Sequence, residues 1–204
     1  MEPTIKLRTA KHFRFSILLG LILLTTMPVA AMARGFYTAV DVGQTSLDQY
    51  CQHEQPPGHS CSNNTTAFRL GGGYQFNPYF GIEASYGNLG TVRLNGTWAT
   101  PDTVVEGKFT EIQLDTIFAL PFSESFSLLF KLGVAKATVD TTYTCCFAND
   151  RSNYAMSVMG VGAQYDISKR LVARTQYEFQ DAQALIGNSP FSISVLSAGV
   201  LWKF

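Results

Sequence analysis

The sequence has no run of about 18 consecutive apolar residues, the length that a membrane-spanning helix needs. It also carries no net charge, since 15 Lys and Arg residues balance 15 Asp and Glu residues. A polyanion such as a nucleic acid is therefore not implied as a partner. Histidine is scarce: of the three residues His12, His53 and His59, none lies in a strand-like segment. A histidine base held on a strand, as in many hydrolases, is thus excluded.

The N-terminal stretch has the features of a targeting segment. Four basic residues between Lys6 and Arg14 precede a short apolar core at Phe15–Leu24, and Ala31-Met32-Ala33 offers a small-x-small cleavage site. We expect residues 1–33 to be a cleaved signal peptide and residues 34–204 to form one domain. All four cysteines lie beyond this leader, which indicates folding in an oxidising compartment.

Apolar residues alternate with small or polar ones throughout the remaining chain. Such a period of two predicts strands with one apolar and one mixed face. We count eight such segments: Gly35–Ser46, Thr66–Phe76, Tyr79–Asn88, Val105–Leu120, Phe126–Val139, Tyr154–Tyr165, Arg170–Phe179 and Ser192–Phe204.

The connections between these segments alternate in length. Turns after the second, fourth and sixth segments are short, such as Asn77-Pro78, whereas the others are long and polar, such as Leu47–Thr66 and Leu89–Val104. The mixed face carries Gly, Arg, Glu, Gln, Asp and Lys and cannot line a dry core, while the apolar face needs lipid to cover it. Aromatic residues also gather beside the short turns: Phe36, Phe76, Phe80, Phe118, Tyr165 and Trp202. The pattern predicts an all-β fold, an eight-stranded antiparallel up-and-down transmembrane β-barrel with long outer loops.

The last strand and several internal motifs resemble one family. The chain ends Ser197-Ala198-Gly199-Val200-Leu201-Trp202-Lys203-Phe204, which resembles the C-terminal strand that presents outer-membrane barrels to their assembly machinery; Gly199, Trp202 and Phe204 would carry that signal. Together with Gly81-Ile82-Glu83-Ala84-Ser85-Tyr86, Lys131-Leu132-Gly133 and Gly160–Asp166, it resembles the small OmpA/OmpX-type barrels. The resemblance implies a bacterial outer-membrane protein that contacts lipid and lipopolysaccharide, is recognised by the barrel-assembly machinery and is a monomer. The chain departs from the OmpA pattern in its four cysteines and in lacking the peptidoglycan-binding domain.

Eight charged residues fall on the inward register. They are Asp41, Glu83, Asp115 and Glu178 with Arg69, Lys131, Arg174 and Lys203. An eight-stranded barrel is just wide enough for side chains to fill it, so we expect these groups to pair. Arg174 is expected to pair with an acid such as Glu178 or Asp115, and strand register, which the sequence leaves open, decides which acid it is. A structural salt-bridge core is preferred over a gated solute path.

The cysteines are candidates for disulfides in the outer loops. Cys51 and Cys61 lie in the first loop, and Cys145 and Cys146 are adjacent in the third. Four cysteines allow three pairings. Cys51–Cys61 closes a short loop and is favoured, although either crossed pairing would join the two loops.

These features favour a non-enzymatic surface protein. His53, His59, Glu54 and Cys51 are spaced too loosely for a compact metal site, and no catalytic, cofactor-binding or metal-binding residue is assigned. We expect a role in envelope integrity, adhesion or binding of a host or surface ligand through the outer loops. The alternatives are a narrow solute pore and a lipopolysaccharide-modifying enzyme.

Overall fold

Every regular element among the described residues is a β-strand. The computed structural model describes residues 35–47, 61–62, 64–95, 104–144, 148–182 and 192–204. In this part of the chain no helix is long and apolar enough to span a membrane. The strands are β1 (Gly35–Ser46), β2 (Cys61–Ser62), β3 (Asn64–Asn77), β4 (Phe80–Asn95), β5 (Val104–Pro121), β6 (Phe126–Tyr143), β7 (Asp150–Asp166), β8 (Leu171–Asp181) and β9 (Ser192–Lys203). The expected leader lies outside these ranges, and its cleavage stays a prediction.

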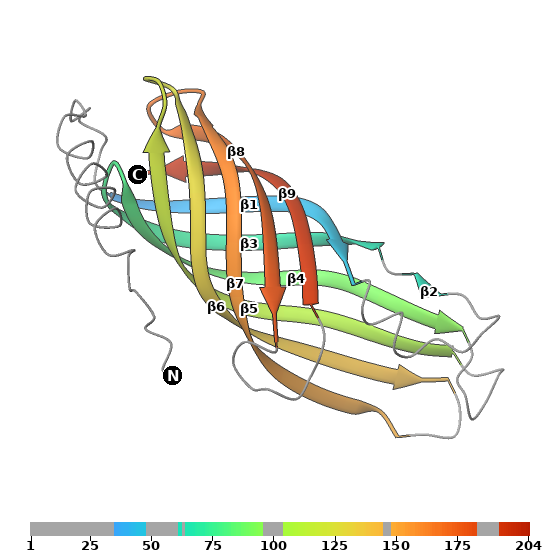
Figure 1. Ribbon diagram of the computed structural model, residues 1–204. Coiled ribbons are helices and arrows are strands. Elements are labelled where there is room, and N and C mark those ends of the chain that lie inside the picture. Colours follow the sequence, from blue (N-terminus) through green and yellow to red (C-terminus); the bar gives the residue numbers. More distant parts are fainter. Residues whose placement is uncertain (1–34, 48–60, 63, 96–103, 145–147, 183–191) are drawn as a thin grey trace, which may run out of the picture. The chain divides into compact units, whose positions relative to one another are not determined.

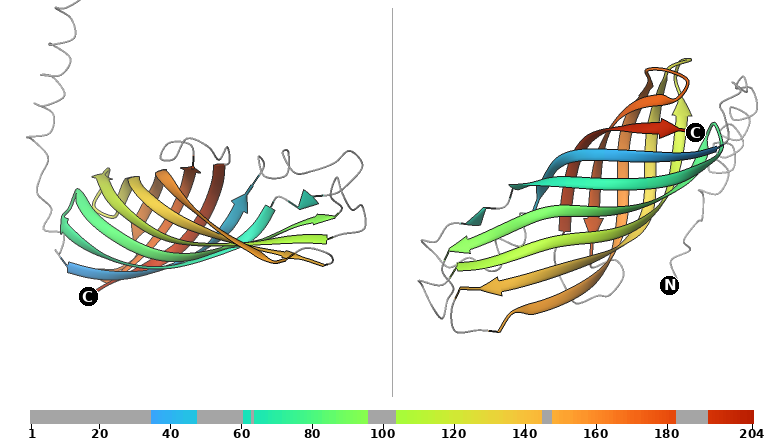
Figure 2. Two further views of the ribbon diagram at one scale, coloured as in Figure 1. Left: turned by 90° about the horizontal axis from the view of Figure 1, so that it is seen from below. Right: turned by 180° about the vertical axis from the view of Figure 1, so that it is seen from behind.

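Eight of the strands close into a barrel (Figure 1). Each long strand pairs antiparallel with the next, and β1 pairs with both β3 and β9, so the sheet has no open edge around its circumference. The two-residue β2 pairs with the outer end of β4 alone. Figure 2 shows the strong tilt of the strands, which closure of a small barrel requires. The predicted eight-stranded barrel is confirmed.

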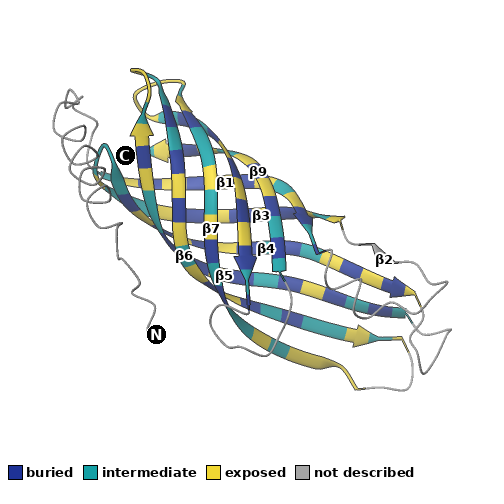
Figure 3. Ribbon diagram, viewed as in Figure 1, coloured by how far each residue is buried: buried dark blue, intermediate teal, exposed yellow. Residues whose placement is uncertain are grey.

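Burial alternates along most of the barrel wall, most regularly on β1, β4 and β8, as Figure 3 shows. Outward residues such as Phe36, Ile112 and Leu114 are 68%, 63% and 56% exposed, whereas inward residues such as Asp41 and Glu178 are 1% and 0% exposed. Inverted polarity of this kind suits a protein surrounded by lipid, because the bilayer core covers apolar side chains and cannot hydrate polar ones.

An aromatic row crosses four strands beside the short turns. Ring centroids lie 4.9 Å apart for Phe36 and Tyr74, 5.0 Å for Tyr74 and Phe76, 5.4 Å for Phe76 and Phe80, and 5.6 Å for Phe80 and Phe118. Amphipathic and aromatic rings at this level anchor a barrel at the membrane boundary. The row therefore marks the boundary at the end that carries the short turns.

Four strands continue well past the barrel mouth at the other end (Figure 1). We name the outer parts of β4, β5, β6 and β7, with β2, the outer sheet. The strand prediction ended too early here: β4 runs to Asn95 rather than Asn88, and much of the predicted loop Leu89–Val104 is strand. The reason is a bulge at Asn88–Gly90, where Gly90 has a φ of +98°. The bulge shifts inward positions from odd to even numbers, which breaks the alternation that sequence reading follows.

Candidate functional site

Buried charge fills the middle of the lumen. Among the described residues, the buried charged side chains are Asp41, Arg69, Glu83, Glu111, Asp115, Lys131, Arg174 and Glu178. Seven of these were expected from the alternation. Lys203 was expected as well, but it is half-buried and pairs with Asp166 at 2.9 Å, at the short-turn end. Glu111, which was not counted in the expected network, completes the buried set.

A three-residue arrangement repeats in this network. A cation, a glycine and a carboxylate face one another across three neighbouring strands, and the cation pairs with the carboxylate over the glycine. We call these the cation–glycine–carboxylate triplets. They are Arg69–Gly87–Glu111, Lys131–Gly160–Glu178 and Arg174–Gly199–Asp41, with ion-pair distances of 2.5, 2.8 and 2.6 Å.

The glycine of each triplet makes room for its ion pair. Neighbouring strands lie about 4.8 Å apart, so the outer two members stand about 9.6 Å apart and their side chains must cross the middle strand. A Cβ at Gly199 would meet the Asp41 carboxylate and the Val40 carbonyl, and one at Gly160 would lie 3.1 Å from Glu178 Cγ. Inward glycines opposite charged residues are the sequence signal that could have revealed this pairing.

Arg174 holds two carboxylates at once. Its Nε and Nη2 donate to Asp41 Oδ1 and Oδ2 at 2.8 and 2.6 Å, while Nη1 and Nη2 donate to Glu83 Oε2 and Oε1 at 2.6 and 3.2 Å. The partners are thus Asp41 and Glu83, and neither Glu178 nor Asp115, the two examples that the sequence suggested while register was open. Glu178 lies four residues along the same strand, about 13 Å away, whereas Asp41 lies in register across Gly199.

The remaining charges join into one network. Arg69 Nη1 donates to Glu178 Oε2 at 2.7 Å, and Lys131 Nζ lies 2.8 Å from Glu178 Oε1 and 3.4 Å from both Glu83 and Asp115. Carboxylates outnumber cations, and a neutral donor meets part of the excess: Gln113 Nε2 lies 2.9 Å from each oxygen of Asp115. Paired charges of this kind replace an apolar core in the middle of the barrel.

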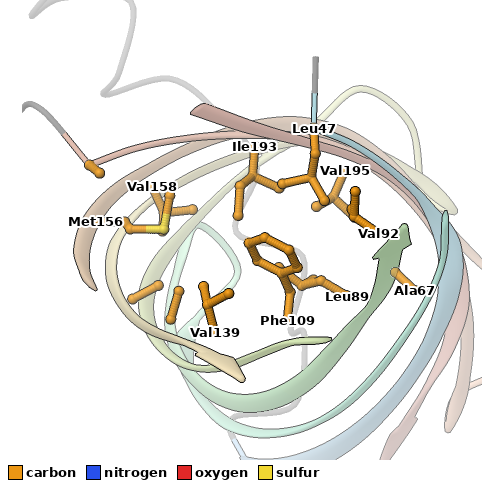
Figure 4. Packing of buried hydrophobic residues seen from close by; sticks show 13 residues of the cluster. Leu47, Ala67, Leu89, Val92, Phe109, Val139, Met156, Val158, Ile193 and Val195 are labelled. Carbon is orange, nitrogen blue, oxygen red and sulfur yellow. The ribbon is translucent and has the colours of Figure 1, made fainter. Parts of the chain in front are cut away.

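An apolar layer covers the charges on the outer side. Phe109 is fully buried at its centre, and Leu47, Leu89, Val92, Val139, Met156, Val158, Ile193 and Val195 belong to the same cluster (Figure 4). A smaller apolar cluster of Tyr37, Ala39, Val172 and Leu201 lies on the other side. The lumen is therefore layered, with charge between two apolar ends.

The lumen leaves little space around the charges. One cavity of about 30 Å³ is lined by Tyr37, Gln164 and Arg174 among others, and one of about 10 Å³ by Asp41, Arg69 and Ser197 among others. Such spaces have the size of single water molecules. Ser197 Oγ and Arg69 Nε, on the wall of the smaller one, make no hydrogen bond to a protein group.

Other predicted residues lie at the ends of the barrel or beyond the described residues. Trp202 and Phe204 are 45% and 72% exposed, and Phe204 N donates to Phe36 O at 3.0 Å, so the last strand seals against the first. Their role in assembly stays a prediction. Cys51, Cys145 and Cys146 lie outside the described residues, as do all three histidines, and Cys61 is described in its backbone alone. Within the described ranges, no three His, Cys, Asp or Glu residues are arranged to hold a metal ion.

Comparison with known proteins decides the family. Residues 16–204 match the family model described as the outer membrane protein beta-barrel domain. The chain belongs to this family. It is an OmpA-like barrel of the bacterial outer membrane.

Curated relatives carry the name outer membrane protein A. The one from Escherichia coli O157:H7 is 25% identical over 88% of this chain and 51% of its own length, and the one from Salmonella typhi is 27% identical over 74% and 43%. The chain thus spans about half the length of the curated relatives it matches.

Solved barrels share the fold. Ail of Yersinia pestis, in complex with the heparin analogue sucrose octasulfate, has a TM-score of 0.57 at 16% identity, covering 85% of this chain and all of its own. Neisserial surface protein A has a TM-score of 0.53 at 19% identity, covering 83% and 97%. The N-terminal barrel of Pseudomonas aeruginosa OprF has 0.55 at 14%, covering 84% and 100%.

Proposed function

We propose that this protein is a non-enzymatic, monomeric surface-binding barrel that presents its outer sheet to a partner outside the cell. The observation that carries the proposal is the length of β4–β7 beyond the barrel. Pairing of β7 with β8 ends at Ser157 and Asp181, whereas pairing of β7 with β6 continues to Asp150 and Thr141. Seven residues of strand extend the sheet by about 23 Å.

Buried apolar residues and surface ion pairs hold the outer sheet in a fixed conformation. Its inner residues Val92, Leu94, Val105 and Val139 are buried, and ion pairs cross its outer face. Arg93 Nε lies 2.8 Å from Glu106 Oε1, and Arg151 Nε lies 2.6 Å from Asp140 Oδ1. The hydrogen bonds from Arg151 hold the pKa of Asp140 below its ordinary value. A surface ordered in advance lowers the entropic cost of capturing a partner.

Closure of the lumen favours binding over transport. A solute path would have to pass the charge network and then the apolar layer around Phe109, which is fully buried. Apolar constrictions exclude water and ions unless they open. We therefore rank the narrow pore below the binding role. A lipopolysaccharide-modifying enzyme ranks lower still, because its candidate bases His53 and His59 fall in none of the segments that the sequence predicts as strands.

The charges on the outer sheet favour a protein partner. Ail was crystallised with a sulfated heparin analogue. A sulfated ligand on this chain would need basic side chains on the outer sheet that pair with no acid. In this chain Arg93 and Arg151 are each engaged by an acid, and Lys108 stands in register with Asp140, the acid that Arg151 already binds. Sheets present main-chain groups and alternating side chains to other proteins, so we propose an extracellular or cell-surface protein.

Cell-surface binding of a shortened variant tests this function. Replacing residues 140–151 by a two-residue Asn-Gly turn removes the β6–β7 end of the outer sheet, and we expect cells to lose adhesion to a matrix-protein array while the barrel keeps its heat-modifiable mobility. The control variant changes Ser123 and Glu124 in the opposite short turn to Asn-Gly and should adhere normally. Unchanged adhesion by the shortened variant would contradict the proposal, and single-channel conductance of the intact protein would favour the pore.

A further inference from the structure

The lipid-facing surface has a furrow along β7. Phe130 on β6, Val161 on β7 and Tyr177 on β8 lie in register across three strands. These residues line two adjoining hollows of about 440 and 400 Å³. Hollows of this size are within the range of small-molecule sites, about 300–1,000 Å³.

The furrow lies where most outward side chains of β7 are short and rings stand on both neighbouring strands. Outward positions on β7 include Ala163, Val161, Ser157 and Ala155, with the longer Met159 between Val161 and Ser157. The rings on the neighbouring strands are Phe130, Tyr177 and Phe179. In the outer hollow Leu132 on β6 joins these walls, and Met159 on β7 lies in register between Leu132 and Phe179. A narrow apolar furrow parallel to the strands can accommodate a single hydrocarbon chain.

A cation stands on β6 beyond the outer hollow, four residues past Leu132. Lys136 continues the outward row of β6 above Val134, is exposed, and pairs in register with Ala155. Among the described residues it makes no ion pair, unlike Arg93 and Arg151. Beyond it the face is polar, since Thr138 Oγ1 lies 2.9 Å from Asn153 Oδ1.

The spacing places Lys136 at the outer membrane boundary. Ten residues separate it from Phe126, whose partner Tyr165 belongs to the aromatic boundary. At about 3.3 Å per residue and a tilt near 40°, this rise is about 25 Å, the height of the apolar band of such barrels. From Lys136 down to Phe130 the same geometry gives about 15 Å, half the thickness of a bilayer core.

We propose that this face is a specific site for one phosphorylated glycolipid of the outer leaflet, with an acyl chain in the furrow and a phosphate on Lys136. The furrow opens to lipid, and Lys136, four residues beyond its last β6 residue Leu132, offers the cation that the phosphate needs. The site is independent of whatever the outer sheet binds. It distinguishes the β6–β7–β8 face from the rest of the lipid-facing surface.

Native mass spectrometry of the purified barrel with lipid A measures the retained lipid. We expect one lipid A on the wild type, about fivefold weaker binding for Lys136→Gln, since a lysine at an anionic surface contributes that much, and loss of binding for Val161→Trp, which fills the furrow. Dephosphorylated lipid A should bind the wild type as weakly as lipid A binds Lys136→Gln. Gel mobility before and after heating checks that each variant is folded.

Two matched variants serve as controls. Lys169→Gln removes an exposed lysine at the opposite boundary, and Val40→Trp enlarges an outward residue on β1; both should retain lipid A as the wild type does. The proposal would be overturned if Lys136→Gln retained as much lipid A as the wild type does. It would also be overturned if Val40→Trp and Val161→Trp lost lipid A to the same extent. Cross-linked dimers that Val161→Trp abolishes would also overturn it, because a second copy would then occupy the furrow.

Discussion

Removing the Arg174 guanidinium should destabilise the barrel more than removing any exposed charge. The Arg174 side chain is 3% exposed and donates four hydrogen bonds to Asp41 and Glu83. Arg174→Ala leaves both carboxylates without their main cation in a site that water barely enters. Breaking a buried pair by removing one partner costs about 3–5 kcal/mol, and we expect a loss of that order.

The molecule contains its own control for this prediction. Lys203 and Asp166 form an ion pair whose side chains are 16% and 23% exposed, at the end of the same lumen. Because water and salt screen such a pair, Lys203→Ala should cost about 0–1 kcal/mol. The contrast between the two variants isolates the effect of burial.

Urea unfolding in lipid vesicles, followed by tryptophan fluorescence, provides the assay. With a slope of roughly 2 kcal/mol per M, the midpoint of Arg174→Ala should fall by about 2 M, whereas that of Lys203→Ala should hardly move. Arg174→Met combined with Asp41→Asn and Glu83→Gln should regain much of the loss, since no unpaired charge then remains. Equal midpoints for Arg174→Ala and the wild type would show that water screens the lumen and would refute the reasoning.

Three further predictions concern the apolar layer, a triplet glycine and the outer sheet. Phe109→Ala should cost about 3–5 kcal/mol by leaving a cavity and should raise ion conductance in planar bilayers; a destabilised but still silent barrel would mean that the charge network alone closes the lumen. Gly199→Ala should destabilise by about 1–3 kcal/mol because its Cβ meets the Asp41 carboxylate, whereas outward Gly72→Ala, 3.7 Å from its nearest neighbour, should be tolerated in the same unfolding assay. Arg151→Ala should raise the depressed pKa of Asp140 toward its ordinary value, because Arg151 is the main cause of the shift and Lys108 a smaller one; carboxyl NMR titration would measure this. The pair stabilises the outer sheet above the unfolded-state pKa of Asp140 and loses this effect as pH falls through the folded pKa, so an unshifted titration would mean that the pair does not form in solution.

Sequence alone was sufficient for the architecture. The period of two determines which side chains share a face of each strand. If β1 were turned over, Asp41 would face lipid and Phe36 would face the lumen, so only one orientation is stable. For that reason Gly35–Ser46 was predicted with its observed bounds. The burial of seven of the eight expected charges followed from the same rule.

Tertiary structure decided the partners and the outer ends of the strands. Alternation places Arg174 in the lumen but does not determine the register between neighbouring strands. That register brings Asp41, and not Glu178, within reach of the Arg174 guanidinium. Register also decides that Lys203, expected in the network, pairs with Asp166 instead, and that Glu111, which alternation places on the same face as Asp115, pairs with Arg69 across Gly87. Beyond Asn88 a bulge at Gly90 shifts the alternation by one residue, so pairing with β5, and not local pattern, carries β4 to Asn95. Inter-strand hydrogen bonds join residues far apart in the chain, and a local period cannot encode which residues they join.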